Sequence, residues 1–154
     1  TSTESKAQIC RGLGAHHVLL YPEATPERIR ELSGGGVAVV FDGVGRDTFD
    51  TGLVSLERRG TLVLFGAASG PVPPVDPQRL NAAGSVFLTR PKLGDFIATT
   101  EEYRERAAEV MEGLVDGSLV LDVGATFGLA DAAQAHRALQ SRRTTGSITL
   151  DPSR

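Results

Sequence analysis

The chain has 154 residues, a formal net charge of -3, and hydrophobic and charged contents of 40% and 23%. These values are ordinary for one globular domain, and the slightly acidic balance offers no basic surface for nucleic acid or an anionic membrane. No apolar run approaches the roughly 18 residues of a membrane span, and we expect no export leader. Cys10 is the single cysteine, which excludes internal disulfides and multi-thiolate zinc sites and predicts a reducing, cytoplasmic location.

The first third of the chain alternates between helix and strand patterns. Residues 5–13 predict a short helix, and the apolar run 17–21 predicts a strand. Residues 26–32 predict a second helix, because Pro26 suits a first helical turn and three glycines follow shortly after it. The run VAVVF at 37–41 is too apolar to alternate, which predicts a strand covered on both faces.

The middle third continues the same alternation. Residues 47–56 predict a helix, and the run TLVLF at 61–65 predicts another strand covered on both faces. A loop rich in glycine and proline follows at 66–77, and residues 85–89 predict a further strand.

The last third begins with the best-marked helix, at 99–117, where Thr99 and Glu102 fit a capping box. Its apolar stripe from Tyr103 to Val115 is expected to face inward. A strand at 120–127, a helix at 130–140 and a strand at 147–150 complete the chain. The alternation predicts an α/β fold, a Rossmann-like, doubly wound and mostly parallel sheet in one domain over 1–154.

Ligands of open parallel sheets bind beyond the carboxyl ends of the strands. Here those ends are Tyr21, the turn 42–45, the loop 65–68 and residues 88–90. Glycines cluster at two of them, which suits close approach of a flat or phosphate-bearing ligand, although glycines there also simply make turns. The G-x-G-x-x-G loop that would carry a pyrophosphate does not occur in the sequence.

Other polar residues indicate little chemistry. The histidines at 16, 17 and 136 do not form a metal set, because adjacent histidines of a strand point to opposite faces. Ser69 does not lie in a nucleophile elbow. Residues 1–6 (TSTESK) place hydroxyls and a lysine at a helix N-terminus, which favours a phosphate, although such a segment is also a common solvated cap.

Four segments together carry a family resemblance. They are STESKAQICRGLGAHHVLLY, VVFDGVGRDTFDTGL, GTLVLFGAASGPVPPVDPQRLNAAGSVFLTRP and AAQAHRALQSRRTTGSITL. In this order and spacing they resemble zinc-independent bacterial quinone oxidoreductases of the zeta-crystallin type, in the medium-chain dehydrogenase/reductase superfamily. The resemblance covers essentially the whole chain and implies NADPH-dependent reduction of a quinone without zinc.

The resemblance also implies cofactor contacts, but no catalytic residue. Ser2 and Lys6 correspond to contacts with the adenosine 2′-phosphate, and Tyr21 to a residue beside the adenine. Arg142 corresponds to a basic residue late in the family's sequence that contacts the cofactor. The contacts implied along the strand ends are Val44, Phe65, Gly66, Ala67, Phe87, Leu88 and Thr89. Gly43 and Ala67 stand where the family commonly has serine and asparagine, so neither is expected to make a side-chain contact.

The resemblance further implies that the chain is partial. The catalytic domain, the first Rossmann strand and its glycine-rich helix would precede Thr1, and residues 127–154 would help complete the catalytic domain. Strand 85–89 would pair across a two-fold axis in a homodimer. Without the pyrophosphate loop, the quinone pocket and the cover that excludes water, the isolated chain is expected to be inactive.

Two other classes of function stay open from the sequence. An S-adenosylmethionine-dependent methyltransferase has a related α/β sheet, and VVFDGVG is similar to its acidic turn, although its glycine motif is lacking. A non-catalytic, dimerising remnant would keep the fold without the chemistry.

Overall fold

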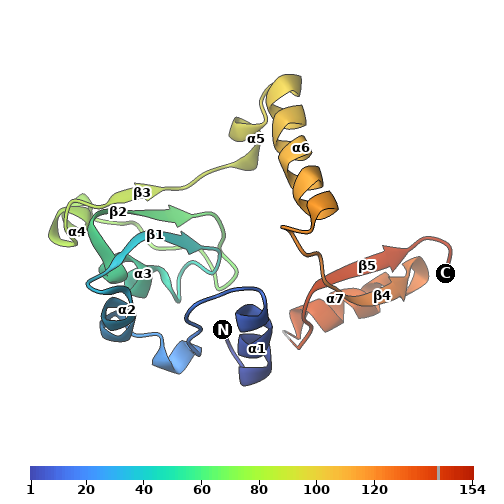
Figure 1. The fold of residues 1–154 in the computed structure, drawn as a ribbon, viewed down its shortest axis with the longest axis horizontal. Helices are drawn as coiled ribbons and strands as arrows, with labels where there is room; N and C mark the ends of the chain where they lie inside the picture. Colours follow the sequence, from blue (N-terminus) through green and yellow to red (C-terminus); the bar gives the residue numbers. More distant parts are fainter. Residues whose placement is uncertain (142) are drawn as a thin grey trace. The chain divides into compact units, whose positions relative to one another are not determined.

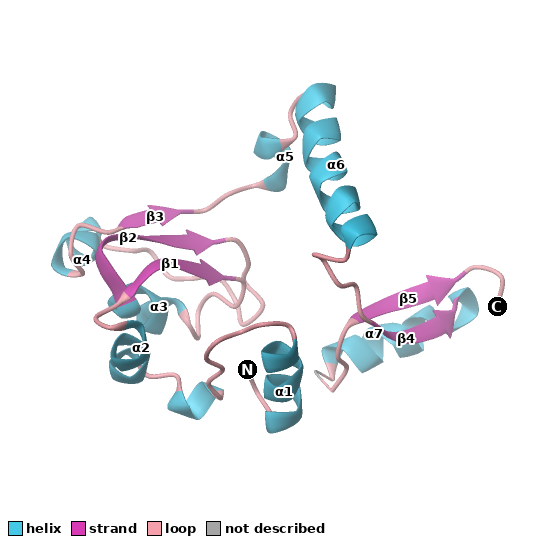
Figure 2. Ribbon diagram, viewed as in Figure 1, coloured by secondary structure: helices cyan, strands magenta, loops and turns pink. Residues whose placement is uncertain are grey.

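The computed structural model describes residues 1–141 and 143–154, which form two compact units, Thr1–Asp95 and Phe96–Arg154. Figure 1 follows the chain by colour, and Figure 2 separates helices from strands. The first unit contains α1 Glu4–Gly12, the 3-10 helix η1 Tyr21–Glu23, α2 Pro26–Ser33, β1 Val37–Asp42, α3 Phe49–Ser55, β2 Leu56–Leu64, α4 Pro77–Ala82 and β3 Phe87–Thr89.

The second unit follows a four-residue helix, α5 Leu93–Phe96, that spans the boundary. It contains α6 Thr100–Asp116, β4 Val123–Gly128, the 3-10 helix η2 Leu129–Asp131, α7 Ala132–Gln140 and β5 Ser147–Asp151. The predicted capping box is confirmed, because the Thr99 hydroxyl accepts from the Glu102 amide and the Glu102 carboxylate accepts from the Thr99 amide. Whether residues 127–154 complete a catalytic domain stays a prediction.

Both sheets are parallel. The first unit has the strand order β1-β2-β3, and the second pairs β4 with β5. Phe41, Val63 and Thr89 lie at one level across the first sheet. Helices α3, α4 and α7 connect the paired strands, as parallel pairing requires. The predicted Rossmann-like α/β class is therefore confirmed.

The core of the first unit lies between α3 and one face of the sheet (Figure 1). Gly52 lets α3 approach β1, because a Cβ there would lie 3.1 Å from Cγ1 of Val40. The core residues are each at most 6% exposed and are Phe49, Leu53, Leu56, Leu62 and Val86.

The other face of this sheet is uncovered, so the prediction that 37–41 is covered on both faces is wrong. Val39 is 45% exposed and Phe41 is 73% exposed. Successive side chains of a strand alternate between faces, and α3 covers the face that carries Val40 and Leu62. Val39 and Phe41 therefore lie on the side that α3 does not reach. The prediction that strand 61–65 is covered on both faces is also wrong, since Leu62 is buried but Val63 and Leu64 are only half-buried.

The apolar stripe of α6 is also exposed rather than inward-facing. Tyr103, Val110, Met111 and Val115 are all more than half exposed. The helix pattern was predicted correctly, but the direction of its apolar face was not.

The run 17–21 is not a strand, which corrects the sequence prediction. Residues 17–20 have no regular structure, and Tyr21 begins η1. The Thr1 amino group donates to the carbonyl of Leu19 at 2.7 Å, and the Tyr21 amide donates to the carbonyl of Thr1 at 2.9 Å. This pattern is one rung of a parallel ladder, and one rung is too short to make a strand.

Among the described residues, none of the helices has the length and apolar content that crossing a membrane requires.

Candidate functional site

Two glycine-rich segments meet at the carboxyl end of the first sheet. The turn 42–48 follows β1, and the loop 65–70 follows β2; we call them together the strand-end platform. Five backbone hydrogen bonds join them: Phe65 and Gly66 amides to the Asp42 carbonyl at 2.9 and 3.2 Å, Ala68 to Gly43 at 3.2 Å, Ser69 to Val44 at 2.8 Å, and Arg46 to Gly70 at 3.1 Å. This bonding makes the platform one connected piece of backbone.

Ser69 adds a side-chain link across the platform. Its hydroxyl donates to the carbonyl of Val44 at 2.8 Å and accepts from the amide of Asp47 at 3.0 Å. Ser69 therefore stabilises the junction of the two segments. The sequence analysis considered this serine only as a nucleophile.

Asp42 holds the same turn through its side chain. Its Oδ1 accepts from the amides of Val44 and Gly45, at 2.7 and 3.0 Å, and from the hydroxyl of Thr48 at 2.8 Å. The sequence analysis considered Asp42 only as part of the acidic turn that is similar to a methyltransferase. An aspartate followed by glycine is a signal for this geometry, because its carboxylate commonly accepts from the backbone two residues ahead.

The platform glycines are required by close contacts. A Cβ on Gly66 would lie 2.3 Å from the carbonyl oxygen of Gly43. Gly45 has a φ of +89°, which L-residues with a Cβ rarely adopt, and a Cβ there would lie 2.8 Å from the carbonyl oxygen of Gly70. These glycines therefore make the turn and also allow the two backbones to touch.

Four of the predicted contact residues lie on the platform: Val44, Phe65, Gly66 and Ala67. The Phe65 ring lies against Gly43, where a Cβ would come within 2.9 Å of the ring. Gly43 thus leaves the space that the ring occupies. The ring is 55% exposed, so it presents an aromatic surface at the strand ends.

The predicted contacts on β3 lie on two faces of the sheet. Phe87 is exposed and Thr89 pairs with Val63, at the carboxyl end of the sheet. Leu88 packs instead against the buried core. The alternation of β3 therefore directs Phe87 and Thr89 toward the uncovered face and Leu88 toward the covered one.

Ser2, Lys6 and Tyr21 belong to a second cluster, at the start of α1. Thr3 caps this helix by accepting from the Lys6 amide at 3.4 Å. The hydrogen bond between Tyr21 and Thr1 brings Tyr21 beside this N-terminus. Ser2 and Tyr21 are exposed and Lys6 is half-buried. Arg142, the remaining predicted contact, lies outside the described residues.

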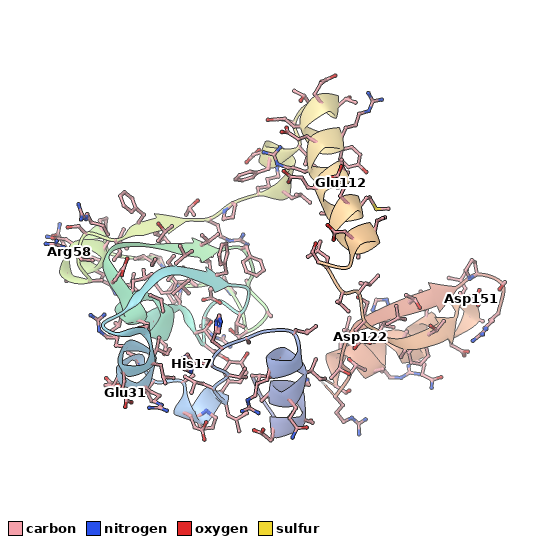
Figure 3. The ribbon with its side chains drawn as sticks, in the orientation of Figure 1. His17, Glu31, Arg58, Glu112, Asp122 and Asp151 are labelled. Atoms are coloured by element: carbon pink, nitrogen blue, oxygen red, sulfur yellow. The ribbon has the colours of Figure 1, made fainter. Side chains whose placement is uncertain are left out.

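The described part of the first unit also has an apolar cavity of about 330 Å³. It is lined by the run around His17, by α2, and by Val37 at the start of β1. Figure 3 labels His17, and it labels Arg58 beside α4, away from the strand tips. Because Val37 is at the opposite end of β1 from Asp42, this cavity provides no part of the platform.

The carboxyl groups with shifted pKa values lie outside the platform. Backbone hydrogen bonding holds the pKa of Glu27 below its ordinary value, and bonding to Ser118 does the same for Asp116. The hydroxyl and amide of Ser153 lower the pKa of Asp151. Among the residues that the structure describes, no three metal-ligating side chains are grouped to hold a metal ion.

Comparison with known proteins identifies the family. The family model for zinc-binding dehydrogenases matches residues 13–150. The chain belongs to this family. It is 43% identical to a quinone oxidoreductase of Salmonella typhimurium over 151 residues, which cover 96% of the chain and 46% of that relative.

Solved structures of this family have the same fold. A mycobacterial protein in complex with NADPH is 55% identical, with a TM-score of 0.93, covering 99% of this chain and 47% of the other. Escherichia coli quinone oxidoreductase in complex with NADPH is 42% identical, with a TM-score of 0.93, covering 99% of this chain and 48% of the other. The chain thus spans about half the length of the relatives it matches. Membership of a dehydrogenase family also removes the support for a methyltransferase.

Proposed function

We propose that the chain is the cofactor-binding portion of an NADPH-dependent quinone reductase. The observation that carries this proposal is the platform, two interlocked glycine-rich segments at the carboxyl ends of parallel strands. In sheets of this class, ligands bind beyond those ends. Bound NADPH would supply a hydride, and one proton taken up from water would complete the reduction of the quinone to a hydroquinone.

The platform suits the nicotinamide end of the cofactor. Gly43, Gly45 and Gly66 let the turn, the loop and the Phe65 ring pack closely together, and this packing fixes the backbone that would face the flat ring. Val44, Phe65, Gly66 and Ala67 would line this end, together with Phe87 and Thr89 of the uncovered face. NADPH supplies the hydride when bound, and the platform orients the ring that carries it.

The cluster at α1 suits the adenosine end. Ser2 would donate a hydroxyl, and Lys6 a positive charge, to the 2′-phosphate that distinguishes NADPH from NADH. Tyr21 would lie beside the adenine. We include Leu88 and Arg142 among the proposed contacts on the resemblance alone.

We also propose a homodimer through β3 and a cytoplasmic location. The order β1-β2-β3 leaves β3 at an edge of the described sheet, with Phe87 exposed, and an exposed strand edge can pair with a second copy. The single cysteine, Cys10, suits a reducing compartment. Sedimentation at several concentrations tests the dimer, which a mass fixed at one chain would contradict.

Turnover tests the reductase proposal. The chain is joined to the part of Escherichia coli quinone oxidoreductase that its aligned region does not cover, and oxidation of NADPH is measured with 1,4-benzoquinone. We expect turnover by the joined protein and none by either half alone. A folded joined protein without turnover would favour the alternative, a non-catalytic dimerising module. Robust turnover by the isolated chain would contradict the proposal that this chain is only the cofactor-binding portion of the enzyme.

A further inference from the structure

We propose that Asp42 is the positioning residue of the platform, setting the place of the cofactor without touching it. This inference rests on the proposed function, because it assumes that the platform binds NADPH. It concerns a side chain that the family resemblance did not assign.

The carboxyl group of Asp42 accepts hydrogen bonds from the turn that follows it. Asp42 is 5% exposed, and its Oδ1 accepts from three donors within 3.0 Å: the Val44 and Gly45 amides and the Thr48 hydroxyl. Three donors on one oxygen fix the turn at its second, third and sixth residues after Asp42. The hydrogen bond to its amide fixes the backbone position of Val44, a proposed cofactor contact.

The main chain of Asp42 holds the other half of the platform. Its carbonyl accepts from the amides of Phe65 and Gly66, at 2.9 and 3.2 Å. One residue therefore bonds both to the turn after β1 and to the loop after β2. A change at Asp42 should move Val44 and Phe65 together.

Asp42 acts from the covered side of the sheet. It is two residues from Val40 along β1, so its side chain lies on the same face, over α3. This leaves the outward side of the platform to a ligand. Asp42 is therefore a positioning residue and not a catalytic one.

The second carboxylate oxygen of Asp42 takes no part in the hydrogen bonds that hold the turn. Among the described residues, Oδ2 of Asp42 is buried and has no hydrogen-bond partner. A buried acceptor left unpaired opposes folding, so the stabilising hydrogen bonds of this side chain that the structure shows are those to Oδ1.

Variants at Thr48 test the inference without removing the buried carboxylate. Thr48→Val removes one donor to Oδ1 at similar volume, and Thr48→Ser restores the hydroxyl. Asp42→Ala removes all three bonds. The control is Asp76→Ala, because Asp76 likewise accepts from a backbone amide, that of Gln78 at 2.9 Å, but at α4, outside the platform.

Two readouts are compared. Amide hydrogen exchange of Val44 and Gly45 is measured in the full chain, and the dissociation constant for NADPH is measured in the joined protein. We expect Thr48→Val to speed exchange and weaken NADPH binding about two- to tenfold, Thr48→Ser to restore both, and Asp42→Ala to weaken binding further. We expect Asp76→Ala to lower stability without changing NADPH binding.

Faster exchange in Thr48→Val with unchanged NADPH binding would overturn the positioning role while leaving the proposed function intact. An equal loss of binding in Asp76→Ala would reduce Asp42 to a general stability effect and also overturn the inference. No NADPH binding by the folded, unmutated joined protein would show instead that the proposed function fails, and the inference would fall with it.

Discussion

Gly66 is the single residue on which the platform geometry depends most. Because a Cβ there would lie 2.3 Å from the Gly43 carbonyl oxygen, Gly66→Ala must push the turn and the loop apart. We expect a loss of about 1–3 kcal/mol in the free energy of unfolding, measured by urea denaturation. Gly12→Ala is the matched control, since a Cβ at this helical glycine meets nothing within 4 Å. An equal effect of the two substitutions would contradict the close contact.

Lys6 tests the choice of cofactor. In the joined protein, Lys6→Gln should raise the KM for NADPH about tenfold or more and leave the KM for NADH nearly unchanged, because a charged hydrogen bond to the 2′-phosphate is lost. The chain has one other lysine, the exposed Lys92, so Lys92→Gln removes the same charge elsewhere. An equal rise in the KM values for NADPH and NADH would show that Lys6 does not bind the 2′-phosphate.

Asp151 provides a prediction about pH. Its Oδ1 accepts from the Ser153 hydroxyl at 2.6 Å and amide at 2.9 Å, and the hydroxyl makes the larger contribution to the lowered pKa. Because the pKa of Asp151 is lower in the folded state, its ionised form stabilises the folded turn at pH values above the unfolded-state pKa, which is near 4. This stabilisation disappears as the pH falls through the folded-state pKa. In an NMR titration, Ser153→Ala should raise the pKa of Asp151 toward its ordinary value. An unchanged pKa would show that the hydroxyl does not stabilise the ionised form.

At the scale of elements, the two faces of the first sheet should respond differently to truncation. Leu62→Ala opens space in the core, where Leu62 is fully buried, and should cost about 2–5 kcal/mol of unfolding free energy. Val39→Ala changes the uncovered face, where the side chain is 45% exposed, and should cost less than about 1 kcal/mol. Similar losses in thermal or urea unfolding would show that the open face is covered in solution.

The helices were predictable because their signals are local. Thr99 with Glu102, Pro26, and the glycines after α2 and α6 define helix ends within a few residues. The parallel pairing of the strands was also predictable, since predicted helices alternate with the apolar runs that predict strands. The platform was predictable in outline, because parallel strands end at a common edge, so Val44 and Phe65 follow neighbouring strands.

What the sequence could not provide depends on contacts between distant segments. The run 17–21 has the composition of a strand, but a strand forms only with a ladder partner, and Thr1 supplies one rung. Val39 and Phe41 were predicted to be buried because composition does not show how many layers cover a sheet. The role of Asp42 depends on which donors the folded turn brings to its carboxylate.

At the scale of the whole molecule, the described chain consists of two units with separate parallel sheets. The platform lies in the first unit, as do Ser2, Lys6 and Tyr21. The chain spans about half the length of its relatives, and the proposed hydride transfer to a quinone would also need a quinone pocket and a cover that excludes water. We therefore expect quinone turnover by the joined protein and none by the chain alone.

Hydrogen exchange read by mass spectrometry tests directly whether the carboxyl ends of the strands bind the cofactor. The joined protein is compared with and without saturating NADPH. We expect protection in peptides covering 42–48 and 65–70, and no change at the opposite end of the sheet, around Gly36, Gly60 and Gly84. Protection at that opposite end, or none in the platform peptides under saturating NADPH, would contradict the proposed site.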